Sequence, residues 1–168
     1  EGSLAPSALA IAGFDEHAVV IDSVSKRYSA CGARVGALVT RNAELRAAAL
    51  RFAQARLSPA TIDQYAAMAA LDTPRSYFRQ VVNEYRARRD ALVAGLKDIG
   101  VECSTPQGAF YLVATLPVQD ADDFCEFLLR EFQLDGQTVM LAPASGFYAT
   151  PGLGKNEIRI AYVLDRER

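Results

Sequence analysis

The chain has 168 residues, of which 51% are hydrophobic and 23% are charged, and its net charge is −2. These values are typical of a globular protein with enough length for one core or two small ones. The near-neutral charge argues against a nucleic-acid surface, because phosphate contacts need clustered Lys and Arg. No stretch approaches the roughly 20 unbroken apolar residues of a membrane span, and the N-terminus lacks a basic-then-apolar signal segment. We therefore expect a cytoplasmic protein with neither a nucleic-acid nor a membrane partner.

The cysteines and the single histidine argue against a metal site or a cysteine-histidine mechanism. Cys31, Cys103 and Cys125 are widely spaced and match no CxxC pattern, so we expect reduced thiols and no metal. His17 follows a polar run in a predicted turn, where a solvated side chain is expected.

The first part of the chain predicts two strands and two helices. Residues 18–24 (AVVIDSV) and 35–40 (VGALVT) are short β-branched runs typical of strands. The ten residues between them are too few for a parallel crossover, so adjacent strands would be antiparallel. Asn42 is a predicted cap for a helix over 43–56. Ser58-Pro59 predicts a second helix, with Pro59 at its first position, that runs to about residue 71.

A long helix is predicted next, opened by Thr73-Pro74 and ended near Gly100. Its span of roughly 35–40 Å is typical of a helix that joins two domains. We therefore place a domain boundary inside this helix, at about 74–99, which divides the chain into domains 1–85 and 86–168. The second domain is expected to hold a helix capped by Asp120 and strands over 109–115, 139–141 and 157–164.

The segment with the clearest chemistry reads SVSKRYSACGARVG and covers residues 23–36. A lysine after a strand lies where α/β folds place their ligands. Its amine is a group that forms Schiff bases with carbonyl compounds. The hydroxyls of Ser23 and Ser25 can bind an anion, and Arg34 offers a planar fork suited to phosphate.

This segment resembles the S-x-S-K-x-x-x-x-x-G-x-R-x-G signature of class I/II, fold type I aminotransferases, which depend on pyridoxal phosphate (PLP). The matching positions are filled by Ser23, Ser25, Lys26, Gly32, Arg34 and Gly36. The resemblance implies that Lys26 forms the internal aldimine and that Ser23, Ser25 and Arg34 hold the cofactor phosphate. It also implies the fold class: an α/β chain with the C-terminal part of the PLP-binding large domain (a mixed sheet) and an α+β small domain, joined by the long helix.

Two later motifs support the resemblance. The family's P-x-G-A-F-Y-type strand is matched at residues 106–111. Arg159, in EIRIAYVL, occupies the position of the family's arginine that pairs with the substrate α-carboxylate. An arginine inside an apolar strand needs a partner of this kind or an internal salt bridge. We expect Phe147 and Tyr148 in a loop at the substrate mouth. Arg56 is expected to be either a solvated helix-end residue or a group that reads a distal carboxylate in the neighbouring subunit.

The sequence also departs from the complete family pattern. Family members are more than twice this long, and no residue here matches the upstream phosphate loop or the Asp that binds the pyridine nitrogen. Asp22, four residues before Lys26, is at the wrong position for that role. The chain is therefore expected to be the C-terminal portion of a longer, homodimeric enzyme.

The expected function is PLP-dependent transamination between an L-amino acid and a 2-oxo acid, in an aspartate-aminotransferase-like enzyme. The same lysine and arginine also serve other PLP enzymes of the fold, such as C–S lyases and synthases, so that alternative stays open. A second alternative is a non-catalytic fragment that acts as a structural or interaction module.

Overall fold

The computed structural model describes residues 5–165 and divides into two compact units. The N-terminal unit covers Gly2–Phe78 and the C-terminal unit covers Arg79–Arg168. The division falls in the first turn of helix α4 (Arg75–Asp98), the long helix that the sequence predicts. The boundary between functional domains near residue 85 lies in the same helix and stays a prediction.

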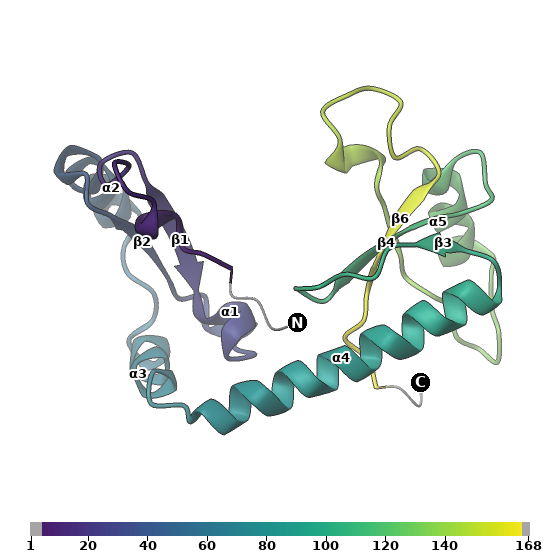
Figure 1. The fold of residues 1–168 in the computed structure, drawn as a ribbon, viewed down its shortest axis with the longest axis horizontal. Helices are drawn as coiled ribbons and strands as arrows, with labels where there is room; N and C mark the ends of the chain where they lie inside the picture. Colours follow the sequence, from purple (N-terminus) through teal and green to yellow (C-terminus); the bar gives the residue numbers. More distant parts are fainter. Residues whose placement is uncertain (1–4, 166–168) are drawn as a thin grey trace. The chain divides into compact units, whose positions relative to one another are not determined.

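The N-terminal unit is built on one antiparallel strand pair (Figure 1). Strand β1 (Val19–Ser23) pairs with β2 (Gly36–Thr40), in a register that runs from Val19 opposite Thr40 to Ser23 opposite Gly36. The predicted antiparallel arrangement is confirmed. The connection between the strands holds one turn of helix, α1 (Val24–Arg27), and a short 3-10 turn, η2 (Cys31–Ala33). Another 3-10 turn, η1 (Ala8–Ala10), precedes the pair.

The two following helices agree with the sequence to different degrees. Helix α2 (Ala43–Arg56) has the predicted bounds, and the Asn42 side chain accepts a hydrogen bond from the Leu45 N–H at 2.8 Å. Helix α3 (Thr61–Ala70) begins two residues after Pro59, so the prediction of proline at the first helical position is wrong. Ala60 has an extended ψ of 140°, so it and Pro59 both precede the first helical residue.

The C-terminal unit contains a four-stranded antiparallel sheet in the order β3-β4-β6-β5. Its elements are β3 (Glu102–Cys103), β4 (Tyr111–Thr115), α5 (Ala121–Arg130), β5 (Ala142–Pro143), η3 (Ser145–Phe147) and β6 (Glu157–Ala161). The predicted cap of α5 is confirmed, since the Asp120 carboxylate accepts from the Asp122 and Asp123 N–H groups. The strand predicted over 139–141 is wrong. The edge of β6 pairs with Ala142 and Pro143 instead, which leaves the apolar run outside the ladder.

The core of the C-terminal unit lies between this sheet and helices α4 and α5. Leu112 of β4 and Ile158 of β6 are its largest fully buried side chains. Helix α4 contributes Val93, and α5 contributes Ala121 and Cys125. The sheet and both helices therefore bury one continuous apolar cluster. Alternate residues of β4 and β6 point into this cluster, as expected for strands with one buried face.

Burial in this core is expected to protect Cys125 from alkylation. Loss of hydration raises the pKa of the Cys125 thiol, and nearby Asp122 raises it further, which lowers the fraction of reactive thiolate. Cys31 is exposed. We expect iodoacetamide to modify Cys31 at least about tenfold faster than Cys125 at neutral pH. Peptide mass spectrometry over a time course measures both rates, and the same rates in urea, where they should converge, provide the control.

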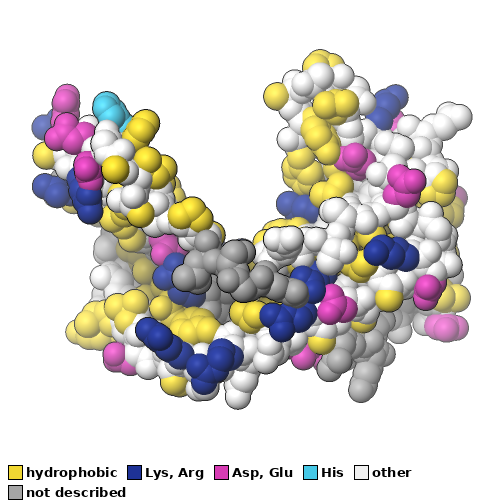
Figure 2. Space-filling model, viewed as in Figure 1, with side chains coloured by type: hydrophobic (Ala, Val, Ile, Leu, Met, Phe, Trp, Pro, Cys, Tyr) yellow, Lys and Arg dark blue, Asp and Glu magenta, His cyan; other side chains and the backbone are white. Residues whose placement is uncertain are grey.

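The N-terminal unit has almost no core of its own. Among its described residues only Ala18 and Thr40 are buried. Large apolar side chains are open to solvent instead, among them Ile21, Phe52 and Leu57 at 74%, 79% and 80% exposure. Hydrophobic side chains, in yellow, are visible on the surface of the part that carries the histidine, in cyan (Figure 2). An apolar surface of this kind is typical of a contact with further polypeptide.

None of the helices within residues 5–165 combines the length and the apolar character needed to cross a membrane.

Candidate functional site

The predicted cofactor lysine lies on a short helical turn fixed to both strands of the N-terminal unit. Ser23 ends β1 and caps α1, its hydroxyl accepting from the Ser25 N–H at 3.4 Å. The Val24 N–H donates to the Val35 carbonyl at 3.2 Å, which ties the start of the turn to the residue before β2. Lys26 is therefore on an exposed turn whose start is held by hydrogen bonds.

The residues predicted to bind phosphate line one cavity of about 650 Å³. Its lining includes Ser23, Ser25, Arg34 and Gly36. The structure therefore brings together Ser23, Ser25 and Arg34, the three residues that were expected to hold the phosphate, with the signature glycine Gly36 beside them. Lys26 itself, on the same turn, is outside that lining.

Charge in this cavity favours an anion. Arg56 of α2 lines the cavity together with Arg34, so two guanidinium groups face it. The carboxylate present, that of Asp22, already pairs with Arg27 at 2.8 Å. Arginine forks and serine hydroxyls are the groups that suit a phosphate dianion. The role of Arg56 as a group lining this cavity was not foreseen, because its position at the end of a helix fits a solvated side chain equally well.

Gly36 allows a close approach between the two strands at this site. A Cβ added at Gly36 would lie 2.8 Å from the Asp22 carbonyl oxygen, a backbone atom that cannot rotate away. The signature glycine at Gly32 differs, since a Cβ there would meet nothing within 4 Å.

This contrast predicts different effects for two alanine substitutions. Gly36→Ala should force the strands apart beside the cavity and destabilise the chain by about 1–3 kcal/mol. Gly32→Ala is the matched control and should change stability by less than about 1 kcal/mol. Urea unfolding measures both, and hydrogen exchange of β1 and β2 locates the change. Equal effects of the two substitutions would contradict the close approach at Gly36.

A thiol lies beside the lysine amine. The Lys26 Nζ donates to the Cys31 Sγ at 3.6 Å, and the Cys31 thiol donates to the Ser25 carbonyl at 3.2 Å. From the sequence, only a reduced thiol is expected at Cys31. The spacing of five residues carries no signal of contact by itself, because it depends on how the loop after α1 turns back.

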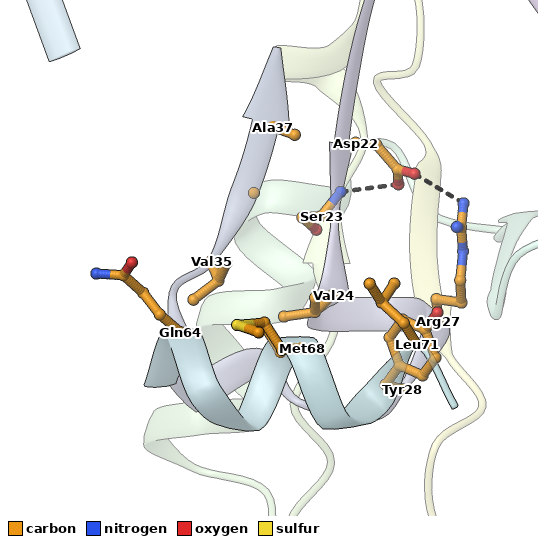
Figure 3. Close-up of a pocket in the computed structure, with 12 residues that line it drawn as sticks. Asp22, Ser23, Val24, Arg27, Tyr28, Val35, Ala37, Gln64, Met68 and Leu71 are labelled. Carbon is orange, nitrogen blue, oxygen red and sulfur yellow. Dashed lines mark hydrogen bonds and ion pairs between the residues drawn. The ribbon is translucent and has the colours of Figure 1, made fainter. Parts of the chain in front are cut away.

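A second cavity, of about 350 Å³, lies on the other side of this turn (Figure 3). Met68 and Leu71 of α3 line it together with Val24 and Tyr28, and Gln64 lies at one end. Its lining is largely apolar, and its one ion pair, Asp22 with Arg27, is internal to the protein. Among the described residues it offers no free charge that would select an anion.

Arg159 occupies a different setting, in the C-terminal unit. It lies on β6 between Val113 of β4 and Ala142 of β5. Its guanidinium stacks over the Tyr111 ring at 4.4 Å and the Phe147 ring at 4.8 Å from the ring centres. Within residues 5–165 the group has no carboxylate partner. The internal salt bridge considered from the sequence is therefore not formed there, and two aromatic rings orient the guanidinium instead.

The loop that carries Phe147 is held in place by the following residue, Tyr148. The Tyr148 hydroxyl donates to the Glu157 carboxylate, and this hydrogen bond raises the pKa of the Tyr148 hydroxyl. A Cβ at Gly154 would lie 2.5 Å from the Tyr148 ring, so the ring lies directly on that glycine, whose φ is +71°. The two neighbouring aromatic residues thus have different roles: Phe147 contacts Arg159, and Tyr148 anchors the loop. The Tyr111–Phe147 pair around the arginine was not foreseen from the sequence.

The strand motif at residues 106–111 has a structural role. The Pro106 carbonyl accepts from the buried Arg89 at 3.0 Å, and the Ala109 carbonyl accepts from the Tyr162 hydroxyl at 3.0 Å. Burial raises the pKa of that Tyr162 hydroxyl. These contacts fix the entry into β4, where Tyr111 is the first residue.

Comparison with known proteins assigns the chain to a family. The model of the family "Aminotransferase class I and II" matches residues 2–168. The aspartate aminotransferase of Thermotoga maritima is 35% identical over 93% of this chain and 37% of its own length. The LL-diaminopimelate aminotransferase of Desulforudis audaxviator is 32% identical over 92% of this chain and 38% of its own length.

Solved structures agree with this assignment. The crystal structure of the T. maritima aspartate aminotransferase aligns with a TM-score of 0.72 at 32% identity, covering 89% of this chain and 36% of that one. The N-succinyldiaminopimelate aminotransferase of Mycobacterium tuberculosis aligns with a TM-score of 0.84 at 26% identity, covering 96% and 42%. The chain thus spans about two fifths of the length of the proteins it matches, and it has the fold type I architecture expected from the sequence. The chain therefore belongs to the class I and II aminotransferase family.

Proposed function

We propose that this chain supplies the cofactor lysine, the phosphate-binding groups and the substrate-binding arginine of a PLP-dependent aminotransferase. The observation that carries the proposal is the cavity beside Lys26. Ser23, Ser25 and Arg34, which are separate in the sequence, line it together, and they are the same residues that the family signature assigns to the phosphate.

The groups present in the chain fit PLP. The cofactor's phosphate would accept from the hydroxyls of Ser23 and Ser25 and from the Arg34 guanidinium, with Arg56 adding a second positive charge. Gly36 allows β2 to lie close to Asp22 and Ser23 of β1 beside this cavity. The adjacent Lys26 amine is the nucleophile for the cofactor's carbonyl carbon.

PLP, when bound, acts as an electron sink for the negative charge that develops at the substrate α-carbon. The chain's own residues would supply two further functions. As a general base, the Lys26 amine would take the proton from the substrate α-carbon. As a general acid, it would then deliver a proton to the 4′ carbon of the cofactor. Arg159 would bind the α-carboxylate through two parallel hydrogen bonds and so orient the substrate.

The chain is proposed to be the C-terminal portion of a longer, cytoplasmic enzyme. It covers 37–38% of the length of the two relatives compared above, and its N-terminal unit exposes apolar side chains that a further domain would bury. The pyridine-nitrogen Asp would come from that further part. A homodimer is proposed by analogy with the family.

The proposed substrates are an L-amino acid and a 2-oxo acid, with an aspartate-like amino acid as the leading candidate. Two relatives carry the names aspartate aminotransferase and LL-diaminopimelate aminotransferase. The second positive charge supplied by Arg56 at the cavity would suit a substrate with a further carboxylate, if the group reaches a bound substrate in the same or the neighbouring subunit.

Product analysis on the complete enzyme tests the reaction. Aspartate, PLP and a 2-oxo acid acceptor should yield a new oxo acid and a new amino acid in equal amounts, and omission of the acceptor should stop the turnover. Ammonia or a sulfur product released without an acceptor would show a lyase instead. Failure of the complete enzyme to bind PLP at all would favour a structural module.

A further inference from the structure

The lysine amine is held by a neighbour that the proposed mechanism does not use. Lys26 and Cys31 are both exposed, yet the Lys26 Nζ lies 3.6 Å from the Cys31 Sγ. An exposed lysine has a flexible four-carbon stem, and holding it in one position costs side-chain entropy. A defined position for such an amine therefore needs a contact that holds it.

Cys31 is itself fixed from two sides. Its thiol donates to the Ser25 carbonyl at 3.2 Å, which leaves sulfur lone pairs to accept from the lysine amine. Its own carbonyl accepts from the Arg34 guanidinium at 3.0 Å. The loop is compact, since Ser29 adopts the left-handed conformation at φ 53°. Cys31 thus contacts Lys26 through its sulfur and Arg34 through its backbone carbonyl.

We propose that Cys31 is a positioning residue for Lys26: its thiol accepts a hydrogen bond from the lysine amine and helps to hold it beside the cavity. This inference rests on the proposed role of Lys26 as the cofactor lysine. An amine held at a fixed place beside the phosphate site meets the cofactor's carbonyl group more often than one that samples solvent. Cys31 makes no contact with the reacting atoms in this scheme and acts through Lys26.

The contact itself is tested first, without PLP. o-Phthalaldehyde condenses with an amine and a thiol that lie side by side and forms a fluorescent isoindole. The 168-residue chain and its Cys103→Ser variant should both form the isoindole between Lys26 and Cys31, located by peptide mapping. Cys31→Ser and Lys26→Met should not. An isoindole absent from Lys26 and Cys31 in the unmodified chain would overturn the proposal.

The role is tested by the rate at which PLP is captured at Lys26. Cyanoborohydride traps the adduct, and the modified Lys26 peptide is quantified over time. Cys31→Ala should slow capture about two- to fivefold, the effect of one weak hydrogen bond. Cys31→Ser retains a donor and an acceptor and should restore most of the rate. Affinity for pyridoxine phosphate, which has the phosphate and no aldehyde, should be the same in all three.

The outcomes separate the two proposals. A rate in Cys31→Ala equal to that of the unmodified chain, or equal losses in the serine and alanine variants, would overturn the positioning role. Equal losses would indicate packing by the sulfur rather than hydrogen bonding. If the unmodified chain captures no PLP at Lys26, the cofactor proposal fails. The contact between Lys26 and Cys31 is then tested by isoindole formation alone.

Discussion

Replacing Lys26 by alanine is expected to abolish covalent capture of PLP and to lower transamination by the complete enzyme by about three orders of magnitude or more. The size of the effect follows from two functions carried by one amine. It forms the bond to the cofactor's carbonyl carbon, and it moves the proton at the substrate α-carbon. Among the described residues near it, none replaces this amine: the Cys31 thiol forms no stable bond of the same kind, and the delocalised guanidinium groups of Arg27 and Arg34 are poor nucleophiles.

The lysine variants need matched controls, which the chain offers. Lys97→Ala removes a lysine from the last turn of α4, and Lys155→Ala removes one that pairs with Asp120 at 3.7 Å on the surface. Both should capture PLP as the unmodified chain does, because exposed pairs of this kind contribute little. Lys26→Arg keeps the positive charge but should be as inactive as alanine. Capture that persists in Lys26→Ala and moves to another lysine would contradict the assignment.

The parts of the fold that the sequence predicts well are those with strong local signals. Asn42 and Asp120 are helix caps whose side chains bond the backbone a few residues on, so the starts of α2 and α5 agree with the sequence. The β-branched runs of β1 and β2 are equally local. In contrast, the apolar run at 139–141 has strand character but lies outside the sheet, because the free edge of β6 pairs one residue further along. Pairing of that kind depends on the rest of the sheet.

The candidate site shows the same division. The signature lists Ser23, Ser25, Lys26 and Arg34 by spacing alone, and the structure adds that three of them line one cavity. The contacts that spacing does not predict depend on how chain segments fold back. Cys31 meets Lys26 only because the loop after α1 turns, and Phe147 meets Arg159 only because its loop returns to β6. Side chains that support a functional group are therefore harder to foresee than the group itself.

The N-terminal unit shows why the burial of apolar side chains could not be predicted fully from the sequence. Sequence patterns indicate which face of a helix is apolar, and a folded core normally confirms that face. In α2 no residue is buried, and Phe52 is 79% exposed. The pattern is consistent with a surface whose partner lies outside this chain, so it describes a contact that the chain alone does not complete.

Replacing Arg159 by lysine is the second change for which a large effect is expected. In the complete enzyme kcat/KM for the amino acid should fall by about two to three orders of magnitude, or about 3–4 kcal/mol, because the bidentate contact with the carboxylate is lost. Lysine keeps the charge, but it lacks the planar fork and cannot lie flat between the Tyr111 and Phe147 rings.

The aromatic contacts predict a smaller effect of Phe147→Leu. Leucine keeps the apolar volume and removes the ring face over which the guanidinium lies, at 4.8 Å from its centre. A loss of about 0.5–1 kcal/mol, or two- to fivefold in kcat/KM, is expected. Because Tyr148 still anchors the loop through Glu157 and Gly154, the variant should fold as the unmodified protein does.

The role of Arg159 in carboxylate binding is separated from a general structural role by the substrate used. With an amine that lacks the α-carboxylate, the unmodified enzyme and Arg159→Lys should react at the same low rate, because the missing carboxylate leaves the arginine nothing to bind. Arg130→Lys is the matched control, since Arg130 lies on the surface of α5 and pairs with Glu126 at 2.8 Å. A loss that is equally large for the amine and the amino acid would show that Arg159 supports the fold of β6 and does not select the carboxylate. The distinction is sharp because the two rings already hold the guanidinium in place, so any selectivity must come from the ligand it binds.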